Sequence, residues 1–264
     1  MFRRKAQITV LLLAGLALAG PSACRRSADA GGEAQPPGEG AYSAPPEVTG
    51  AARAPGGGER LEGTAPADSR VRLGQPGGEA FTAKADPAGR WILVLPPAAQ
   101  ARIFGLSVLI EDRAVQAEGY VLVGPDGEAA LLRAGASAVR LDAPTGPGIA
   151  TLDIDAAGGG LLSGFAEPGS DVAIRIDGRG GSEARSDEAG RFSFTMPRLA
   201  GGPHRLEVAG VKLQQALAFD VAAPAPLDQG PLRATATPAG LRADWLTPGG
   251  GAQTTILARS WRMP

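Results

Sequence analysis

The side chains that most often perform chemistry are scarce in this chain of 264 residues. It contains one cysteine, Cys24, and one histidine, His204. A lone cysteine has no disulfide partner within the chain, and these two residues cannot complete the usual ligand set of a zinc ion. No G-x-S-x-G nucleophile motif occurs. We therefore expect no catalytic residues, no metal site and no cofactor.

The chain also lacks an excess of charge of one sign and long hydrophobic runs. Its formal net charge is −1 at pH 7, so it has no basic field that would attract nucleic acid. After residue 24, no apolar stretch approaches the ~18 residues of a transmembrane helix. Glycine and proline are abundant instead, with 39 and 23 residues. Their scatter along the chain favours many turns between short strands.

Residues 1–23 have the layout of a signal peptide. A positively charged stretch, Arg3 to Lys5, precedes the uncharged run 8–20. That run is too short to cross a ~30 Å hydrocarbon core as a helix, but it has the length of a signal-peptide hydrophobic region. These features predict export from the cytoplasm by the general secretory route.

Cys24 directly follows Pro-Ser-Ala, and this stretch resembles the lipobox of bacterial lipoproteins, with Pro21 where leucine is usual. The resemblance implies that Cys24 is lipidated, for example with palmitate, and that a lipid anchor holds the protein to a membrane. Arg25 after the cysteine favours the outer membrane, with the protein facing the periplasm. The alternative is cleavage by ordinary signal peptidase at the A-x-A site 17–19, which would leave a soluble periplasmic protein.

Residues 24–45 form a linker of Ala, Gly, Pro, Glu and Ser without apolar periodicity. Such a segment cannot bury enough apolar surface to offset the entropy of ordering it. We therefore expect the lipidated cysteine to be followed by a disordered tether.

Beyond the tether the sequence repeats itself with an offset of 101 residues. GTAPADSRV (63–71) recurs as GFAEPGSDV (164–172), and DPAGRW (86–91) recurs as DEAGRF (187–192). After one deletion, Leu106 and Val108 align with Leu206 and Val208. A register kept over this length indicates a duplication. The repeat residues singled out are Gly63, Asp86, Gly89, Arg90, Trp91, Gly164, Asp187, Gly190, Arg191 and Phe192.

Each part of the repeat has a structural interpretation. Alternating apolar residues after Ser69 and after Ser170 are typical of half-buried strands. The D-x-x-G-R segments predict tight hairpin turns, in which the aspartate bonds the turn backbone and the glycine takes a positive φ. Trp91 and Phe192 then begin the next strand as equivalent core residues. The Gly-x-Ala segments keep side chains small where neighbouring strands approach closely.

Further short strands follow each copy, and no helical period of useful length appears after residue 24. The repeat resembles the bacterial Ig-like domains of surface and envelope proteins. The resemblance implies an all-β protein of two tandem Ig-like β-sandwich domains after a signal peptide and a disordered tether. The expected divisions of the folded part are a first domain over 46–145, a second domain over 146–224 and a C-terminal β-hairpin extension over 225–264.

Three groups of side chains invite a functional interpretation. Asp153 and Asp155 share one side of a strand near Asp142 or Asp187, so they suggest either calcium or a solvated strand face, and we favour the latter. His204 is interpreted as an exposed residue at the start of a strand. Trp245, Trp261 and Tyr120 would be either a sugar-stacking platform or core residues, and core is favoured.

These observations predict a non-enzymatic cell-envelope lipoprotein with a structural or protein-interaction role. Its partners would be the membrane, through the lipid anchor, and either an envelope protein or a glycan. The alternative function is that of a carbohydrate- or peptidoglycan-binding module of the periplasm. An enzyme with an unfamiliar site is the third hypothesis, disfavoured by the scarcity of histidine and cysteine.

Overall fold

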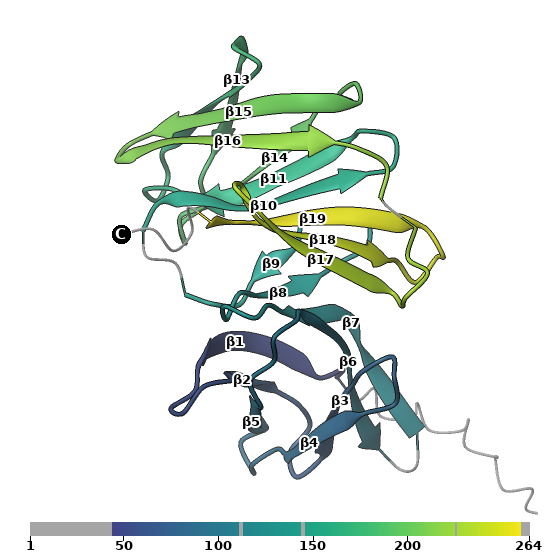
Figure 1. Ribbon diagram of the computed structural model, residues 1–264. Helices are drawn as coiled ribbons and strands as arrows, with labels where there is room; N and C mark the ends of the chain where they lie inside the picture. The colour runs from purple at the N-terminus through teal and green to yellow at the C-terminus, as the bar shows by residue number, and fades with distance from the viewer. Residues whose placement is uncertain (1–43, 111–112, 144–145, 225, 260–264) are drawn as a thin grey trace, which may run out of the picture. The chain divides into compact units, whose positions relative to one another are not determined.

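The computed structural model describes residues 44–110, 113–143, 146–224 and 226–259, and regular structure within these ranges is almost entirely β-strand (Figure 1). No helix in this part of the chain is long and apolar enough to cross a membrane. The signal peptide, Cys24, the expected tether up to residue 43, and Trp261 lie outside the described residues.

The first sandwich consists of two antiparallel sheets that enclose one core. Its smaller sheet has the order β1-β2-β5, with bounds Glu47–Arg53, Glu59–Thr64 and Arg90–Leu95. Its larger sheet has the order β4-β3-β6-β7-β8-β9, with bounds Ala80–Lys84, Arg70–Gly74, Arg102–Ile110, Arg113–Val123, Ala129–Leu132 and Val139–Arg140. Strands β3 and β5 bury alternate residues, as the apolar periodicity predicted. The core is built around Leu61, Val71, Trp91, Phe104 and Val121.

The second sandwich repeats this arrangement. One sheet has the order β13-β12-β15-β16, with bounds Arg179–Arg185, Asp171–Ile176, Gly202–Gly210 and Leu213–Val221. The other has the order β14-β11-β10-β19-β18-β17, with bounds Arg191–Met196, Gly160–Phe165, Gly148–Asp155, Ala252–Ala258, Gly240–Leu246 and Leu232–Thr237. In both copies the fourth strand, β4 or β13, pairs with the third strand rather than with β5 or β14. The expected all-β fold with tandem sandwiches is confirmed.

The C-terminal strands β17, β18 and β19 form a meander that continues a sheet of the second sandwich. Strand β19 pairs along β10, the first strand of that sandwich, and β18 and β17 follow outward. The extension is therefore three strands rather than a separate hairpin, and it leaves β10 in the middle of a six-stranded sheet.

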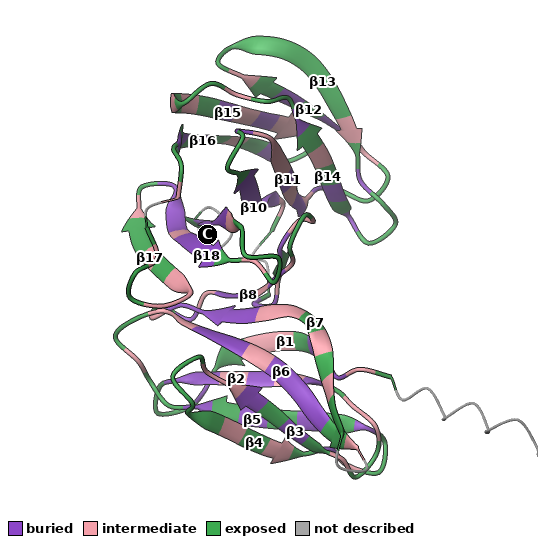
Figure 2. Cartoon of the chain, turned by 90° about the vertical axis from the view of Figure 1, so that its right-hand side faces the viewer, coloured by how far each residue is buried: buried purple, intermediate pink, exposed green. Residues whose placement is uncertain are grey.

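This six-stranded sheet buries residues on both of its faces. Ile256 and Ala258 of β19 belong to the core of the second sandwich. Leu241, Ala243 and Trp245 of β18 instead belong to a third apolar cluster, which also contains residues of β6, β7 and β8 in the first sandwich. Figure 2 shows the buried stretches of β6, β7, β8 and β18 in purple. The outer faces of one sheet from each sandwich thus pack together in an interface cluster, completed by Ile103, Leu122, Ala130, Leu132, Ala138 and Leu257.

Two details of the repeat differ from the sequence-based expectation. The segments 86–90 and 187–191 do not close hairpins, because β4 and β5, like β13 and β14, lie in different sheets. Both segments are corners that lead the chain from one sheet to the other. The ladder register also shifts the alignment of the later strands: Leu106 faces Leu73, whereas Val208 faces Ile174, so the ladder matches Leu106 to Val208 and not to Leu206.

Candidate functional site

The repeat residues hold the corner of each sandwich together. Gly63 lies opposite Trp91, and Gly164 opposite Phe192, in equivalent ladders. A Cβ atom on Gly63 would lie 1.9 Å from the carbonyl oxygen of Glu47 and 2.6 Å from the Trp91 ring. The indole of Trp91 in turn donates a hydrogen bond from Nε1 to the carbonyl of Thr64 (3.0 Å). These glycines leave room for the aromatic core residue and the first strand.

The two corners have matching hydrogen bonds. Asp86 Oδ1 accepts from the N–H of Ala88 (2.9 Å) and of Arg90 (2.8 Å), and Asp187 Oδ1 accepts at equivalent positions. Gly89 and Gly190 both have φ +77°, a conformation that favours glycine. The hydrogen bond from the N–H of Arg90 is the main cause that lowers the pKa of the Asp86 carboxyl. The aspartates are therefore engaged in turn geometry.

The corners differ in their arginines. Arg90 Nε lies 3.2 Å from Asp86 Oδ2. Among the described residues, no ion pair joins the equivalent Arg191 and Asp187, and no side-chain hydrogen bond involves the Arg191 guanidinium. The two copies thus share the turn geometry, but only the first copy pairs its arginine with the turn aspartate.

The Asp153 carboxylate lies inside the molecule, only 3% exposed, so the interpretation of a solvated strand face was wrong. Its Oδ2 accepts from the N–H of Ala138 (2.9 Å), and its Oδ1 accepts from Thr255 Oγ1 (2.6 Å). Gln253 and Thr151 add weaker contacts at 3.4 Å. Burial raises the pKa of Asp153 to about 6, against the opposing effect of these hydrogen bonds. Asp153 connects the segment between β8 and β9 to the sheet of the second sandwich.

The other carboxylates that were considered for calcium are also engaged within the structure. Asp142 forms a bidentate pair with Arg140, with distances of 2.7 and 2.5 Å, and both side chains are almost fully buried. Asp155 accepts from the N–H groups of Ala157 and Gly159 at an exposed turn. Within the described ranges, no group of three or more His, Cys, Asp or Glu residues could hold a metal ion.

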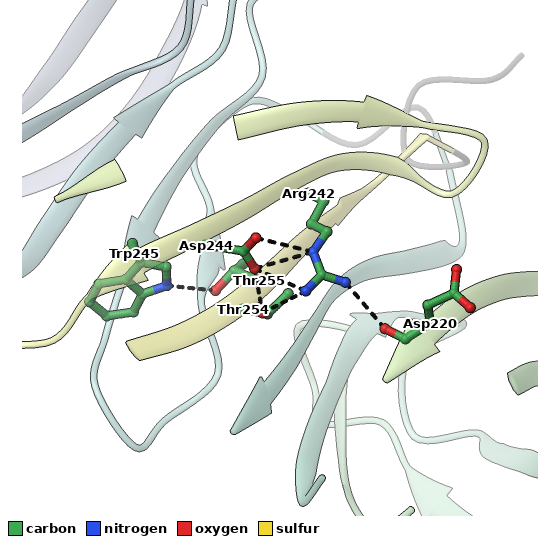
Figure 3. A network of polar contacts seen from close by, with 6 residues as sticks. All are labelled: Asp220, Arg242, Asp244, Trp245, Thr254 and Thr255. Atoms are coloured by element: carbon green, nitrogen blue, oxygen red, sulfur yellow. Dashed lines mark hydrogen bonds and ion pairs between the residues drawn. The ribbon is translucent and has the colours of Figure 1, made fainter. Parts of the chain in front are cut away.

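A second buried ionic network ties the C-terminal meander to β16 (Figure 3). Arg242 Nε lies 3.1 Å from Asp244 Oδ1, and Arg242 Nη1 donates to the carbonyl of Asp220 (3.2 Å). Thr254 Oγ1 donates to Asp244 Oδ1 at 2.5 Å. Asp244 on the same strand thus balances the charge of Arg242, while Nη1 of Arg242 contacts β16 in the opposite sheet.

His204 is more engaged than expected, because only 11% of its side chain is exposed. Its Nδ1 lies 2.8 Å from Asp177 Oδ2 and its Nε2 lies 2.8 Å from the carbonyl oxygen of Ala200. Two acceptors favour the doubly protonated ring. The backbone bond to Ala200 and then the bond to Asp177 raise the pKa of His204. His204 lies near the start of β15, as predicted, but the expected exposure of its side chain was wrong, because the ring connects two loops.

The tryptophan platform for a sugar does not form around Trp245. This ring is 0% exposed, and its Nε1 donates to Thr255 Oγ1 (3.1 Å). Tyr120 packs edge-on against it, with ring centroids 6.1 Å apart. Both rings belong to the packing between the sandwiches, as the core interpretation predicted for Trp245.

Two cavities flank this packing. One, of about 480 Å³, is mainly apolar and lies beside Tyr120, Phe104, Pro231 and Leu246. The other, of about 410 Å³, is bounded by the β8–β9 segment on one side and by β14 on the other. We call the second cavity the arginine groove, and it is defined by Arg133, Arg140, Ser163, Arg185, Arg191 and Ser193.

Sequence reasoning identified Arg191 as a repeat residue but did not detect the groove. Arg133 and Arg140 are separated from Arg185 and Arg191 by about fifty residues and come from different sandwiches. Only the fold brings them together. The one signal in the sequence was the predicted hairpin 113–133, which interrupts the repeat. The segment that follows this hairpin forms one wall of the arginine groove.

Comparison with known proteins gives little further information. No family model matches the chain, and no curated protein matches it. Among solved structures, the chain is similar to the central fibronectin-III array of RIM-binding protein, with 14% sequence identity, coverage of 81% of this chain and 88% of that chain, and a TM-score of 0.25. At that TM-score the likeness carries no argument about function. The assignment of tandem β-sandwiches rests on the strands themselves.

Proposed function

We propose that this protein is a non-enzymatic lipoprotein of the cell envelope, anchored through Cys24, whose paired sandwiches have a structural or protein-interaction role. The N-terminal charges, the short hydrophobic run and the cysteine after Pro-Ser-Ala support the anchor. The expected location is the outer membrane, with the sandwiches in the periplasm. A soluble periplasmic protein is the competing outcome.

The observation that carries the scaffold role is the use of the buried ionic groups. Asp142, Asp153 and Asp244 each bond residues that hold strands or loops in place. Asp153 accepts from Ala138 across the junction of the sandwiches, and Arg140, the partner of Asp142, donates to the carbonyl of Ala258 in the second sandwich (3.5 Å). Such groups fix the relative position of the two sandwiches, as a spacer or docking module requires.

The anchor is tested by metabolic labelling with an alkyne analogue of palmitate in a bacterium that processes lipoproteins. The wild-type chain is expected to incorporate the label and to fractionate with membranes. The Cys24→Ser variant is expected to lose the label and to appear in the periplasmic fraction. Because Cys24 is the only cysteine, no other thiol can take its place. Membrane association of an unlabelled Cys24→Ser chain would refute the lipid anchor.

A further inference from the structure

We propose that the arginine groove binds an extended, acidic polypeptide segment of a partner protein. This inference deepens the proposed interaction role and rests on it. Three features of the molecule support it: the charge of the groove, its open strand edge, and the contrast with the equivalent face of the first sandwich.

Of the four arginines that define the groove, two are paired with a carboxylate of the described residues and two are not. Asp142 neutralises Arg140, and Asp171 lies 2.7 Å from Arg185. In the described ranges, no carboxylate oxygen lies within ion-pair distance of Arg133 or Arg191. Arg133 donates only to the backbone carbonyl of Ser137 (3.1 and 2.8 Å).

The single acidic side chain lining the groove is Asp187, and its Oδ1 is already occupied by two backbone N–H groups. Two guanidinium groups, Arg133 and Arg191, are thus available for an anionic ligand, and they lie on opposite walls of the groove. Guanidinium groups suit carboxylates because they can bond both oxygens at once.

One wall of the groove is an open strand edge. Strand β14 pairs only with β11, and no described strand pairs along its other side. In an antiparallel sheet, alternate residues of an edge strand present their N–H and C=O groups outward. An extended peptide can add to such an edge, and its alternate side chains would then face the groove. Regularly spaced backbone donors and acceptors match a polypeptide better than a small anion.

The first sandwich provides an internal control. Its equivalent positions, offset by 101 residues, carry Glu62 where the groove has Ser163, and Ile92 where it has Ser193. Glu62 bonds Arg60 (2.6 Å), and Ile92 is 55% exposed. The β8–β9 segment that forms the second wall has no counterpart there. The first copy thus has an acidic and an apolar side chain where the groove has two serines, and its Arg90, equivalent to Arg191, is paired with Asp86.

The test measures the binding of fluorescein-labelled hexaglutamate to the purified full chain by fluorescence anisotropy, with labelled hexaglutamine as the neutral probe. Hexaglutamate is expected to bind at least about tenfold more tightly than hexaglutamine, with affinity that falls as salt rises. The Arg191→Glu variant is expected to lose about tenfold or more of this affinity. The matched Arg90→Glu variant changes the equivalent residue of the first sandwich and is expected to change affinity less than twofold.

Thermal melting of both variants checks that they fold, since each substitution lies on an exposed strand residue. A second readout is the ¹H–¹⁵N spectrum, in which hexaglutamate is expected to shift amide signals of β14 and of Ser137 to Val139. Equal loss of affinity in the two variants, or equal binding of the two peptides, would overturn the proposal.

Competition by millimolar inorganic phosphate as effective as competition by unlabelled hexaglutamate would also overturn it, in favour of a small-anion site. The result is independent of the anchor. Peptide binding by a chain that is not lipidated would uphold the groove and refute the anchor. Lipidation without peptide binding would do the reverse.

Discussion

Glycine at positions 63 and 164 is required by the residue that faces it. At position 164 a Cβ atom would lie 2.4 Å from the carbonyl oxygen of Gly148 and 2.5 Å from Cζ of Phe192. One of these neighbours is backbone and the other is a buried ring, so neither can move without cost. Gly-x-Ala is therefore the sequence signature of an aromatic residue packed against the opposite strand.

We expect Gly164→Ala to lower the free energy of unfolding by about 1–3 kcal/mol, because the added methyl group overpacks the corner. Urea denaturation followed by tryptophan fluorescence measures this loss. The control is Gly181→Ala on β13, where nothing lies within 4 Å of the added Cβ atom. If both variants unfolded at the wild-type urea concentration, the close approach at Gly164 would have no energetic importance.

Residues whose environment is local were predictable from the sequence, and residues whose environment is assembled from distant segments were not. Trp91 and Phe192 were assigned to the core from their place after the predicted turn, where each begins an alternating strand, and they are 1% and 3% exposed. Asp153 also lies on a strand of alternating sequence, but its carboxylate accepts from Ala138 of the β8–β9 segment and from Thr255 of the neighbouring strand β19, about a hundred residues later. Alternation cannot show that a second layer covers a polar face.

At the scale of elements, strand β10 is the central one. It pairs with β11 on one side and with β19 on the other, and seven of its residues, Gly148 to Ile154, are buried. In the corner segments 86–90 and 187–191, the local turn geometry does not decide which sheet the next strand joins. That choice depends on the core, which is why a hairpin was predicted where the chain changes sheets.

Burial of Asp153 predicts a pH dependence of stability. The folded-state pKa of about 6 lies above the ordinary value of 3.8. Between these values the folded protein holds a proton that the unfolded chain has released, so stability falls as pH rises through this window. The raised pKa corresponds to a total loss of about 3 kcal/mol as the pH rises from below 3.8 to above 6.

The Asp153→Asn variant is expected to lack this part of the slope in urea denaturation at a series of pH values. The Asp155→Asn variant, two residues along the chain at an exposed turn, is expected to keep it. The slope of unfolding free energy against pH is compared, rather than the free energy itself. An amide among the hydrogen-bond donors of Asp153 lowers stability equally at every pH and leaves this slope unchanged. An unchanged slope in Asp153→Asn would show that Asp153 does not titrate differently in the folded state.

At the scale of the whole molecule, the duplication supplied two sandwiches and the unrepeated strands joined them. Strand β8 extends a sheet of the first sandwich, and the meander β17–β19 extends a sheet of the second. Their side chains meet in the interface cluster, and Asp153 adds a polar connection beside it. The sequence predicted strands in the region of β8 and in the meander β17–β19. It could not show that these strands pack against each other, because neither segment is repeated in the other copy.

This packing predicts that the two sandwiches unfold together. Differential scanning calorimetry of the wild-type protein is expected to show one transition. Trp245→Ala removes the largest side chain of the interface cluster, at a cost of about 3–5 kcal/mol, and is expected to separate unfolding into two transitions. Leu246→Ala changes the next residue of β18, which is 38% exposed, and is expected to retain a single transition near the wild-type temperature. A single, unshifted transition in Trp245→Ala would mean that the interface cluster does not couple the sandwiches. The rigid scaffold would then lose its physical basis, because two independently unfolding domains could not fix the two walls of the arginine groove.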